Sequence, residues 1–181
     1  MTTTKRIYLA GPEVFFPEDD HQAIVGAKKR ILAEFGFEGI DPLDTALDFP
    51  EHQSRRVWGE RIYRTNRHLM DRCDAIIANL TPFRGLSADP GTVFEVGYMV
   101  GQGKVAFGFS MDHRNYYQRA GARPQDDHGH TIEPFELVDN LMIECGIEES
   151  GGRIYTAEPG NQAAWFDDGV FTRCVKALAE P

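Results

Sequence analysis

The stretch DAIIANL, residues 74–80, is the segment of this sequence that decides the fold. It is a nearly continuous apolar run between turn residues, which is typical of a strand buried on both faces of a parallel sheet. The turn TPFRG, residues 81–85, follows it directly. We therefore expect residues 74–80 to form the central strand of a parallel sheet.

Three further short apolar runs predict the remaining strands of this sheet. They lie at residues 7–10, 38–41 and 104–109. The first run ends at a Gly-Pro pair, residues 11–12, which indicates a turn.

Helical spacing of apolar residues predicts the segments that connect these strands. Asp89-Pro90 marks one helix start, because aspartate is a good N-cap and proline is favoured at the first helical position. That helix should end at residues 101–103, where two glycines stand. A polar loop is expected from about residue 110 to 133, followed by a short element over 138–145. The other expected helices cover residues 20–35, with Ile24, Ala27, Ile31 and Phe35 on one face, residues 56–72, with Ile62, Asn66, Leu69 and Cys73 on one face, and residues 162–179.

Strands that alternate with helices predict a parallel sheet covered on both faces through right-handed crossovers. We therefore predict a flavodoxin-like, doubly wound α/β fold, formed as one domain over residues 1–181. Ligands of such folds bind beyond the carboxyl ends of the strands. Residues 8–15, residues 79–89 and the chain from residue 108 onward should emerge at that edge.

Charge and composition narrow the class of partner. The chain has 28 acidic and 19 basic residues, a formal net charge of −9. Nucleic acid is disfavoured because phosphate binding needs a basic footprint, so a small neutral ligand fits better. No apolar stretch approaches the roughly 20 residues of a membrane span, and the first residues are too short for a signal-peptide core. We expect a cytoplasmic protein without a membrane partner.

The cysteines Cys73, Cys145 and Cys174 are odd in number and widely spaced. This pattern argues against a disulfide framework and against a structural zinc site. We expect all three to be buried thiols.

Glu95 is the most informative residue, because it lies within the apolar sequence TVFEVGYMV, residues 92–100. A carboxylate in such surroundings is costly unless a partner or a function retains it. Two interpretations stay open: a salt-bridged or capping glutamate, or a functional acid. The helix begins only a few residues earlier, so its dipole should help to keep Glu95 ionised.

Asp89 lies six residues before Glu95, a little under two helical turns, so both carboxylates should lie along one side of the helix. Its position as an N-cap could explain Asp89 fully. It could also bind a substrate hydroxyl, because the start of this helix faces the ligand edge of the sheet.

Other side chains could contact a ligand. Asn66 and Asn140 stand in apolar contexts, where an amide satisfies backbone groups or reads a sugar or base. The aromatic residues Phe15, Phe16, Trp58 and Phe83 either belong to the core or stack on a planar ligand.

No cofactor signature is recognisable in the sequence. The glycines do not form a dinucleotide-binding or P-loop motif. His128 and His130, with two aspartates nearby, lie in the expected polar loop without the helical spacing of a zinc site. We predict neither a metal nor an organic cofactor.

Five motifs together resemble the nucleoside 2-deoxyribosyltransferase family. They are IYLAGP (residues 7–12) with Val14-Phe15, DAIIA (74–78), TPFRG (81–85), DPGTVFEVG (89–97) and NLM (140–142). Their order and spacing agree with the family from residue 7 to residue 142.

The resemblance implies that Glu95 is the catalytic nucleophile, that Asp89 holds the 5'-hydroxyl of the deoxyribose and that Tyr8 orients Glu95. Asn140 and Met142 match family residues that reach across a subunit interface, which implies a homo-oligomer. The substrate-binding set that we predict from the motifs also contains Gly11, Phe15, Asn66, Phe83 and Arg84.

Position 66 is an aspartate in some members of the family, where it handles the proton of the departing base. Here it is Asn66, which can donate a hydrogen bond but cannot act as an acid. The group that protonates the base therefore stays open.

The expected substrates are a 2'-deoxynucleoside and a free nucleobase. A glutamate would attack the anomeric carbon and form a covalent deoxyribosyl ester, as in retaining glycosidases. One alternative is a hydrolase of the same lineage that releases deoxyribose, or its 5'-phosphate, to water. Asp89 favours a nucleoside over a nucleotide because it would repel a phosphate. A non-catalytic nucleotide- or flavin-binding module is another alternative, since this fold has many functions.

Overall fold

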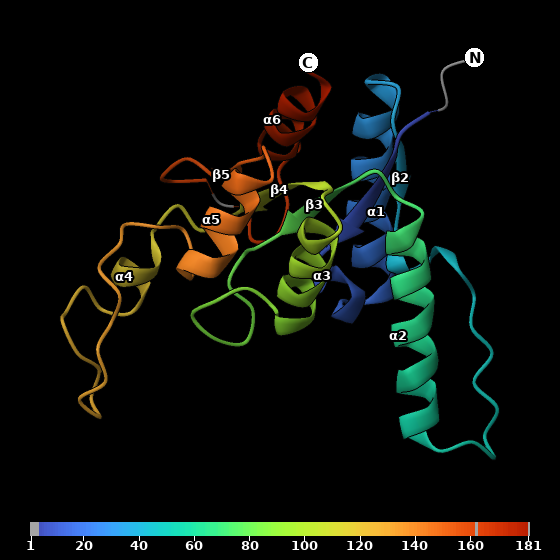
Figure 1. The fold of residues 1–181 in the computed structure, drawn as a ribbon, viewed down its shortest axis with the longest axis horizontal. Coiled ribbons are helices and arrows are strands. Elements are labelled where there is room, and N and C mark those ends of the chain that lie inside the picture. Colours follow the sequence, from blue (N-terminus) through green and yellow to red (C-terminus); the bar gives the residue numbers. More distant parts are fainter. Residues whose placement is uncertain (1–3, 162, 181) are drawn as a thin grey trace.

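The computed structural model describes residues 4–161 and 163–180. They form a five-stranded, all-parallel sheet in the order β2-β1-β3-β4-β5, with helices on both faces (Figure 1). This arrangement confirms the predicted flavodoxin-like fold. The elements are β1 (Arg6–Ala10), η1 (Pro12–Phe15), α1 (Glu18–Glu34), β2 (Glu38–Ile40), η2 (Pro42–Asp44), α2 (Arg55–Asp71), β3 (Ala75–Asn79), α3 (Pro90–Gly101), β4 (Val105–Ser110), α4 (Tyr116–Arg119), α5 (Leu141–Glu149), β5 (Ile154–Thr156) and α6 (Asp168–Ala179).

The segment DAIIANL supplies β3, the central strand, and every residue of that strand is buried. It pairs in parallel with β1, Ile7 opposite Ala75, and with β4, Ala75 opposite Val105. Its continuous apolar run follows from helices covering both faces of the sheet.

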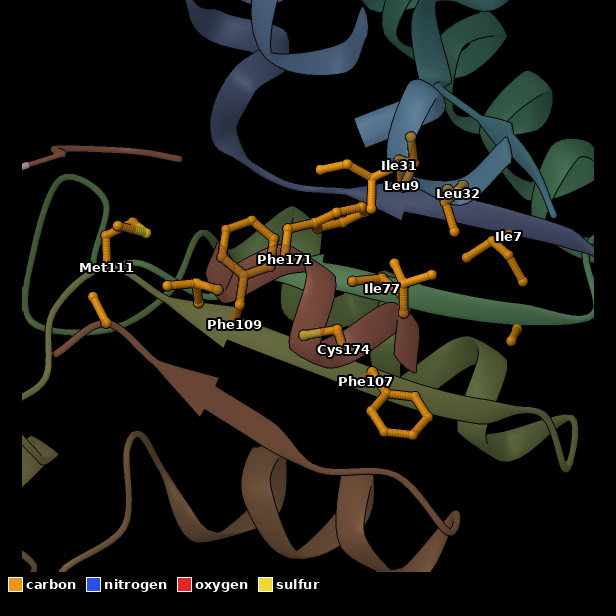
Figure 2. Close-up of a cluster of buried hydrophobic side chains, with 14 residues drawn as sticks. Ile7, Leu9, Ile31, Leu32, Ile77, Phe107, Phe109, Met111, Phe171 and Cys174 are labelled. Carbon is orange, nitrogen blue, oxygen red and sulfur yellow. The ribbon is translucent and has the colours of Figure 1, made fainter. Parts of the chain in front are cut away.

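One face of the sheet packs against α1 and α6. Figure 2 shows the side chains of this core, with Phe109 and Phe171 in edge-to-face contact at a centroid distance of 5.8 Å. Such aromatic pairs add to the free energy gained from burial alone.

The opposite face packs against α3 and α5, with Met70 at the end of α2. Tyr8 and Ile76 point to this side because side chains alternate along a strand. The face that carries Tyr8 is therefore the face that α3 covers.

The buried face of α1 differs from the predicted one. Val25, Lys28 and Leu32 are buried there, whereas Ala27 is only half-buried. Lys28 is 1% exposed and donates a hydrogen bond to Glu13 at 2.6 Å. The spacing of apolar residues could not predict that the charged Lys28 lies on the buried face of α1.

The second half of the chain contains the other differences. The expected polar loop includes the short helix α4, and the element expected at 138–145 is the helix α5, residues 141–149. The edge strand β5 was not predicted, because it has only three half-buried residues. The last helix begins at Asp168 rather than at residue 162, which lies outside the described residues.

Cys145 corrects the expectation of three buried thiols. Cys73 and Cys174 are buried, but Cys145 is exposed. It lies two residues from both Ile143 and Ile147, the buried positions of α5, and so points to the opposite side of the helix.

Helix α2 exposes several apolar side chains, among them Ile62, which the predicted apolar face would place in a core. Val57, Ile62 and Tyr63 are each more than a third exposed, and Phe94 of α3 is 52% exposed.

In the described part of the chain, no helix has the length and apolar character needed to cross a bilayer.

Candidate active site

The site is built on a contact between the first strand and the third long helix. The Tyr8 hydroxyl on β1 donates a hydrogen bond of 2.7 Å to Glu95 Oε1 on α3. Tyr8 is fully buried. Its ring orientation is therefore fixed by the core, and its hydroxyl holds the Glu95 carboxylate against β1.

Burial changes the acidity of both groups. Burial raises the pKa of Glu95 to about 7, while the hydrogen bond from Tyr8 opposes this rise. Burial and the neighbouring Glu95 charge raise the pKa of Tyr8 far above its usual value. The tyrosine therefore stays a donor, and Glu95 changes charge near neutral pH.

This acidity differs from the prediction that the helix dipole keeps Glu95 ionised. Burial outweighs the dipole here, and the charge of Asp89 raises the pKa of Glu95 further. An anion near a helix N-terminus gains about 0.3–1 kcal/mol at exposed sites, which is smaller than the cost of burying a carboxylate.

Asn66 and Asp89 complete the surroundings of Glu95. The Asn66 amide on α2 interacts with the Glu95 carboxylate and lowers its pKa. Asp89 Oδ2 accepts the Thr92 backbone N–H at 3.0 Å, which confirms the predicted N-cap of α3. The structure thus brings Tyr8, Asn66, Asp89 and Glu95 together, although they come from distant parts of the sequence.

Asp41 is a neighbour that sequence reasoning missed. It follows β2, is 3% exposed, and its charge raises the pKa of both Tyr8 and Glu95. Burial raises the pKa of Asp41 itself. The available signal was a polar residue directly after a strand, at the ligand edge of the sheet.

Phe15, Phe83 and Arg84 form one stack beside the site. The two rings lie parallel with centroids 5.5 Å apart. The Arg84 guanidinium lies 4.9 Å from the Phe15 centroid and 4.7 Å from the Phe83 centroid, within cation–π range. Phe15 remains 53% exposed and can contact a ligand.

A cavity of about 690 Å³ adjoins this stack and is lined by residues 83–90 and Tyr116. Arg84 adopts a left-handed backbone with φ of 56°, an uncommon conformation for a residue other than glycine. Asp89 lies on the wall of this cavity.

Gly11 lies where the backbone leaves β1 and turns into η1. A Cβ atom at this position would stand 1.9 Å from Glu13 Oε2 and 3.0 Å from Asn79 Cβ. Only glycine allows the buried Glu13 carboxylate to approach this closely.

Asn140 and Met142 lie at the start of α5. The Asn140 side chain accepts the Met142 N–H at 3.0 Å and is the N-cap of the helix. Its amide also donates to Glu133 at 3.3 Å. Met142 is 76% exposed, so its side chain is available to another molecule.

The aromatic residues Phe16 and Trp58 both pack within the chain. Phe16 contacts Trp165 at a centroid distance of 5.0 Å, and Trp58 contacts Phe49 at 5.3 Å. Among the residues that the structure describes, no three His, Cys, Asp or Glu side chains are grouped to hold a metal ion.

Comparison with known proteins identifies the family. A family model described as nucleoside 2-deoxyribosyltransferase matches residues 7–142. The chain belongs to the nucleoside 2-deoxyribosyltransferase family. The matched region contains Tyr8, Asn66, Asp89 and Glu95, the four side chains that meet in the site.

Solved structures agree with this family. A 2-desoxiribosyltransferase from Leishmania mexicana superposes with a TM-score of 0.69 at 30% identity, covering 95% of this chain and 97% of that one. A 2-deoxyribosyltransferase from Bacillus psychrosaccharolyticus, at 21% identity, covers 92% of this chain and 95% of its own and shares the fold with a TM-score of 0.51.

A protein of Schizosaccharomyces pombe described as uncharacterised is 35% identical over 129 residues. The match covers 71% of this chain and 60% of that protein. The chain therefore spans about 60% of the length of this curated relative.

Proposed function

We propose that the protein is a nucleoside 2-deoxyribosyltransferase that exchanges the base of 2'-deoxynucleosides through a covalent deoxyribosyl-Glu95 intermediate. The single observation that carries this proposal is the Tyr8–Glu95 contact of 2.7 Å between β1 and α3. It holds a carboxylate in one orientation without neutralising it. A nucleophile of this kind requires both properties.

The reaction proceeds in two displacements at the anomeric carbon. One Glu95 oxygen forms a bond to C1' while the bond from C1' to the base nitrogen breaks, and its electron pair leaves with the base. A nitrogen of a second base then attacks C1', gives up its proton to water and releases the Glu95 carboxylate. Charge and atoms balance, and the sugar keeps its configuration after two inversions.

Each neighbouring side chain has a distinct part in this proposal. Tyr8 and Asn66 donate hydrogen bonds that favour the carboxylate form of Glu95. Asp89 accepts a hydrogen bond from the 5'-hydroxyl, and the stacked Phe15 and Phe83 offer an apolar wall to the base. The departing base takes its proton from water, because Asn66 is not an acid.

The preference for deoxy sugars follows from the chemistry of the transition state. Positive charge develops at C1', and an electron-withdrawing 2'-hydroxyl would destabilise it. A 2'-deoxynucleoside is therefore the more reactive substrate.

We also propose that the protein works as a homo-oligomer. The exposed apolar side chains Val57, Ile62 and Tyr63 of α2 and Phe94 of α3 support this, because adjacent exposed apolar side chains commonly mark interfaces. Met142 would then contact the site of a neighbouring subunit.

Base exchange tests the proposal directly. The purified protein is incubated with a 2'-deoxynucleoside and a different free base, and the products are separated by liquid chromatography. The expected product is the exchanged nucleoside. Glu95→Gln should abolish exchange, whereas Glu34→Gln, at an exposed glutamate of α1, should leave it unchanged.

The covalent intermediate offers a second measurement. Mass spectrometry of the protein mixed with substrate, without acceptor base, should show one added deoxyribosyl group, absent in Glu95→Gln. Release of free deoxyribose as the main product, even with acceptor base present, would replace the transferase by a hydrolase. Full turnover in Glu95→Gln would refute the role of Glu95.

A further inference from the structure

Asp139 is a buried carboxylate that the reaction above does not use. It is 2% exposed and precedes Asn140 at the start of α5. One oxygen accepts hydrogen bonds from Ser87 Oγ at 2.7 Å and from the Asn140 N–H at 2.8 Å. The other accepts the Ala88 N–H at 2.9 Å and faces Arg119 Nη2 at 3.5 Å.

Arg119 of α4 is the counter-ion and binds two further segments. Its side chain is 3% exposed. It donates from Nε to the Leu86 carbonyl at 2.8 Å and from Nη1 to the Arg114 carbonyl at 2.7 Å. The Asp139–Arg119 pair therefore connects residues 86–88, residues 114–119 and the start of α5.

The Asp139 carboxylate binds the backbone directly beside Asp89. Ala88 directly precedes Asp89, so the carboxylate of Asp139 holds the backbone one residue before the proposed ligand of the 5'-hydroxyl. Residues 83–90 and Tyr116 line the cavity at this point. A buried ion pair adds little net stability compared with apolar residues of the same size. The chain segments that it joins point instead to a role in geometry.

We propose that Asp139, held by Arg119, is a positioning residue that fixes the loop carrying Asp89 for substrate binding. The inference rests on the proposed function, in which Asp89 binds the 5'-hydroxyl. The same carboxylate fixes the N–H of Asn140, so the start of α5 is held in register with this loop.

The test compares two substrates in an Asp139→Asn variant. An asparagine has no charge and only one oxygen, so it can accept on one side alone: either the Ala88 N–H and Arg119 or the Asn140 N–H then meets the NH₂ group and loses its acceptor. With a 2'-deoxynucleoside, kcat/KM should fall about 10- to 100-fold, mainly through KM, because Asp89 is displaced. With the matching 2',5'-dideoxynucleoside, which lacks the hydroxyl that Asp89 binds, the loss should be less than about threefold.

Glu13→Gln is the matched control. Glu13 is also a buried carboxylate, 3% exposed and paired with Lys28 at 2.6 Å, but the contacts of its side chain lie with Lys28 and Asn79, away from residues 86–89. Any loss in this variant should be the same for both substrates. Equal losses for both substrates in Asp139→Asn would overturn the proposal. Ser87→Ala removes one donor, leaves the ion pair intact and should show the same substrate difference at smaller size.

Hydrogen exchange of the ligand-free protein separates this inference from the proposed function. Amides of residues 86–92 should exchange at least about tenfold faster in Asp139→Asn than in the wild type. In Glu13→Gln their exchange rates should equal those of the wild type. Unchanged exchange in Asp139→Asn would refute the positioning role even in an active enzyme. If Asp139→Asn exchanges faster but the wild type transfers no base, the positioning role of Asp139 is supported and the proposed transferase activity is rejected.

Discussion

Replacing Tyr8 by phenylalanine separates the two effects that set the acidity of Glu95. The variant keeps the buried ring and removes the hydroxyl that donates to Glu95 Oε1 at 2.7 Å. This hydrogen bond opposes the effect of burial on the pKa of Glu95, which stands at about 7. Its loss should therefore raise that pKa further.

The size of this shift follows from the energy of a hydrogen bond to a charged group, about 1.5–3 kcal/mol. One pKa unit corresponds to about 1.4 kcal/mol, so the pKa of Glu95 should rise by about one to two units. At pH 7 the ionised fraction falls from about one half to between about a tenth and a hundredth. Ionisation alone then lowers kcat/KM at pH 7 by about 5- to 50-fold.

The measurement is the pH profile of kcat/KM for base exchange. In the wild type, kcat/KM should rise with pH through about 7, because only ionised Glu95 attacks. In Tyr8→Phe the rise should move to higher pH, and the loss relative to wild type should shrink to less than about 1.5-fold near pH 9.5. Tyr98→Phe is the control. Tyr98 lies on α3, as Glu95 does, but it donates its hydrogen bond of 2.7 Å to Asp71. A Tyr8→Phe profile whose rise stays at the wild-type pH would refute the reasoning.

Three further predictions follow from the same contacts. Because the folded-state pKa of Glu95 is raised from 4.5 to about 7, its contribution to stability is present below pH 4.5 and is lost as the pH rises through 7. Measured by urea unfolding, Glu95→Gln should therefore be more stable than the wild type by about 1–3 kcal/mol at pH 8. The two proteins should be equally stable near pH 4. Equal stability at pH 8 would contradict the burial argument. Asp89→Asn removes a charge that raises the pKa of Glu95, so the rise of kcat/KM should move to lower pH, and a move to higher pH would count against their proximity. If Met142 serves a neighbouring site, mixing the inactive variants Glu95→Ala and Met142→Lys should restore about a quarter of wild-type activity in a dimer, whereas no recovery after subunit exchange would exclude a shared site.

Much of the fold was readable because the sheet imposes strong local patterns. The apolar run of β3 is typical of a strand covered on both faces, and Asp89-Pro90 marked the start of α3 to the residue. By contrast, β5 has three half-buried residues and follows two glycines, Gly151 and Gly152. A strand this short is defined by pairing with β4, a contact that local sequence does not contain.

The sequence indicated which residues form the site, but it did not predict their pKa shifts. The apolar context of Glu95 indicated burial, yet the direction of its pKa shift depends on the sum of burial, Tyr8, Asn66 and Asp89. Asp139 shows the same limit. An aspartate before a helix suggests a cap, whereas its bonds to Ala88 and Ser87 join segments more than 50 residues apart.

The contact between β1 and α3 has a consequence for how a ligand affects the whole molecule. Tyr8 and Glu95 are separated by 87 residues, so their meeting requires the paired central strands and a docked helix. A ligand that contacts both residues therefore binds the folded molecule alone. Occupancy of the site should therefore protect the entire sheet against heat, by about 2.7 kcal/mol at a free ligand concentration one hundred times Kd. The melting temperature then reports binding even for a nucleoside that the protein never turns over.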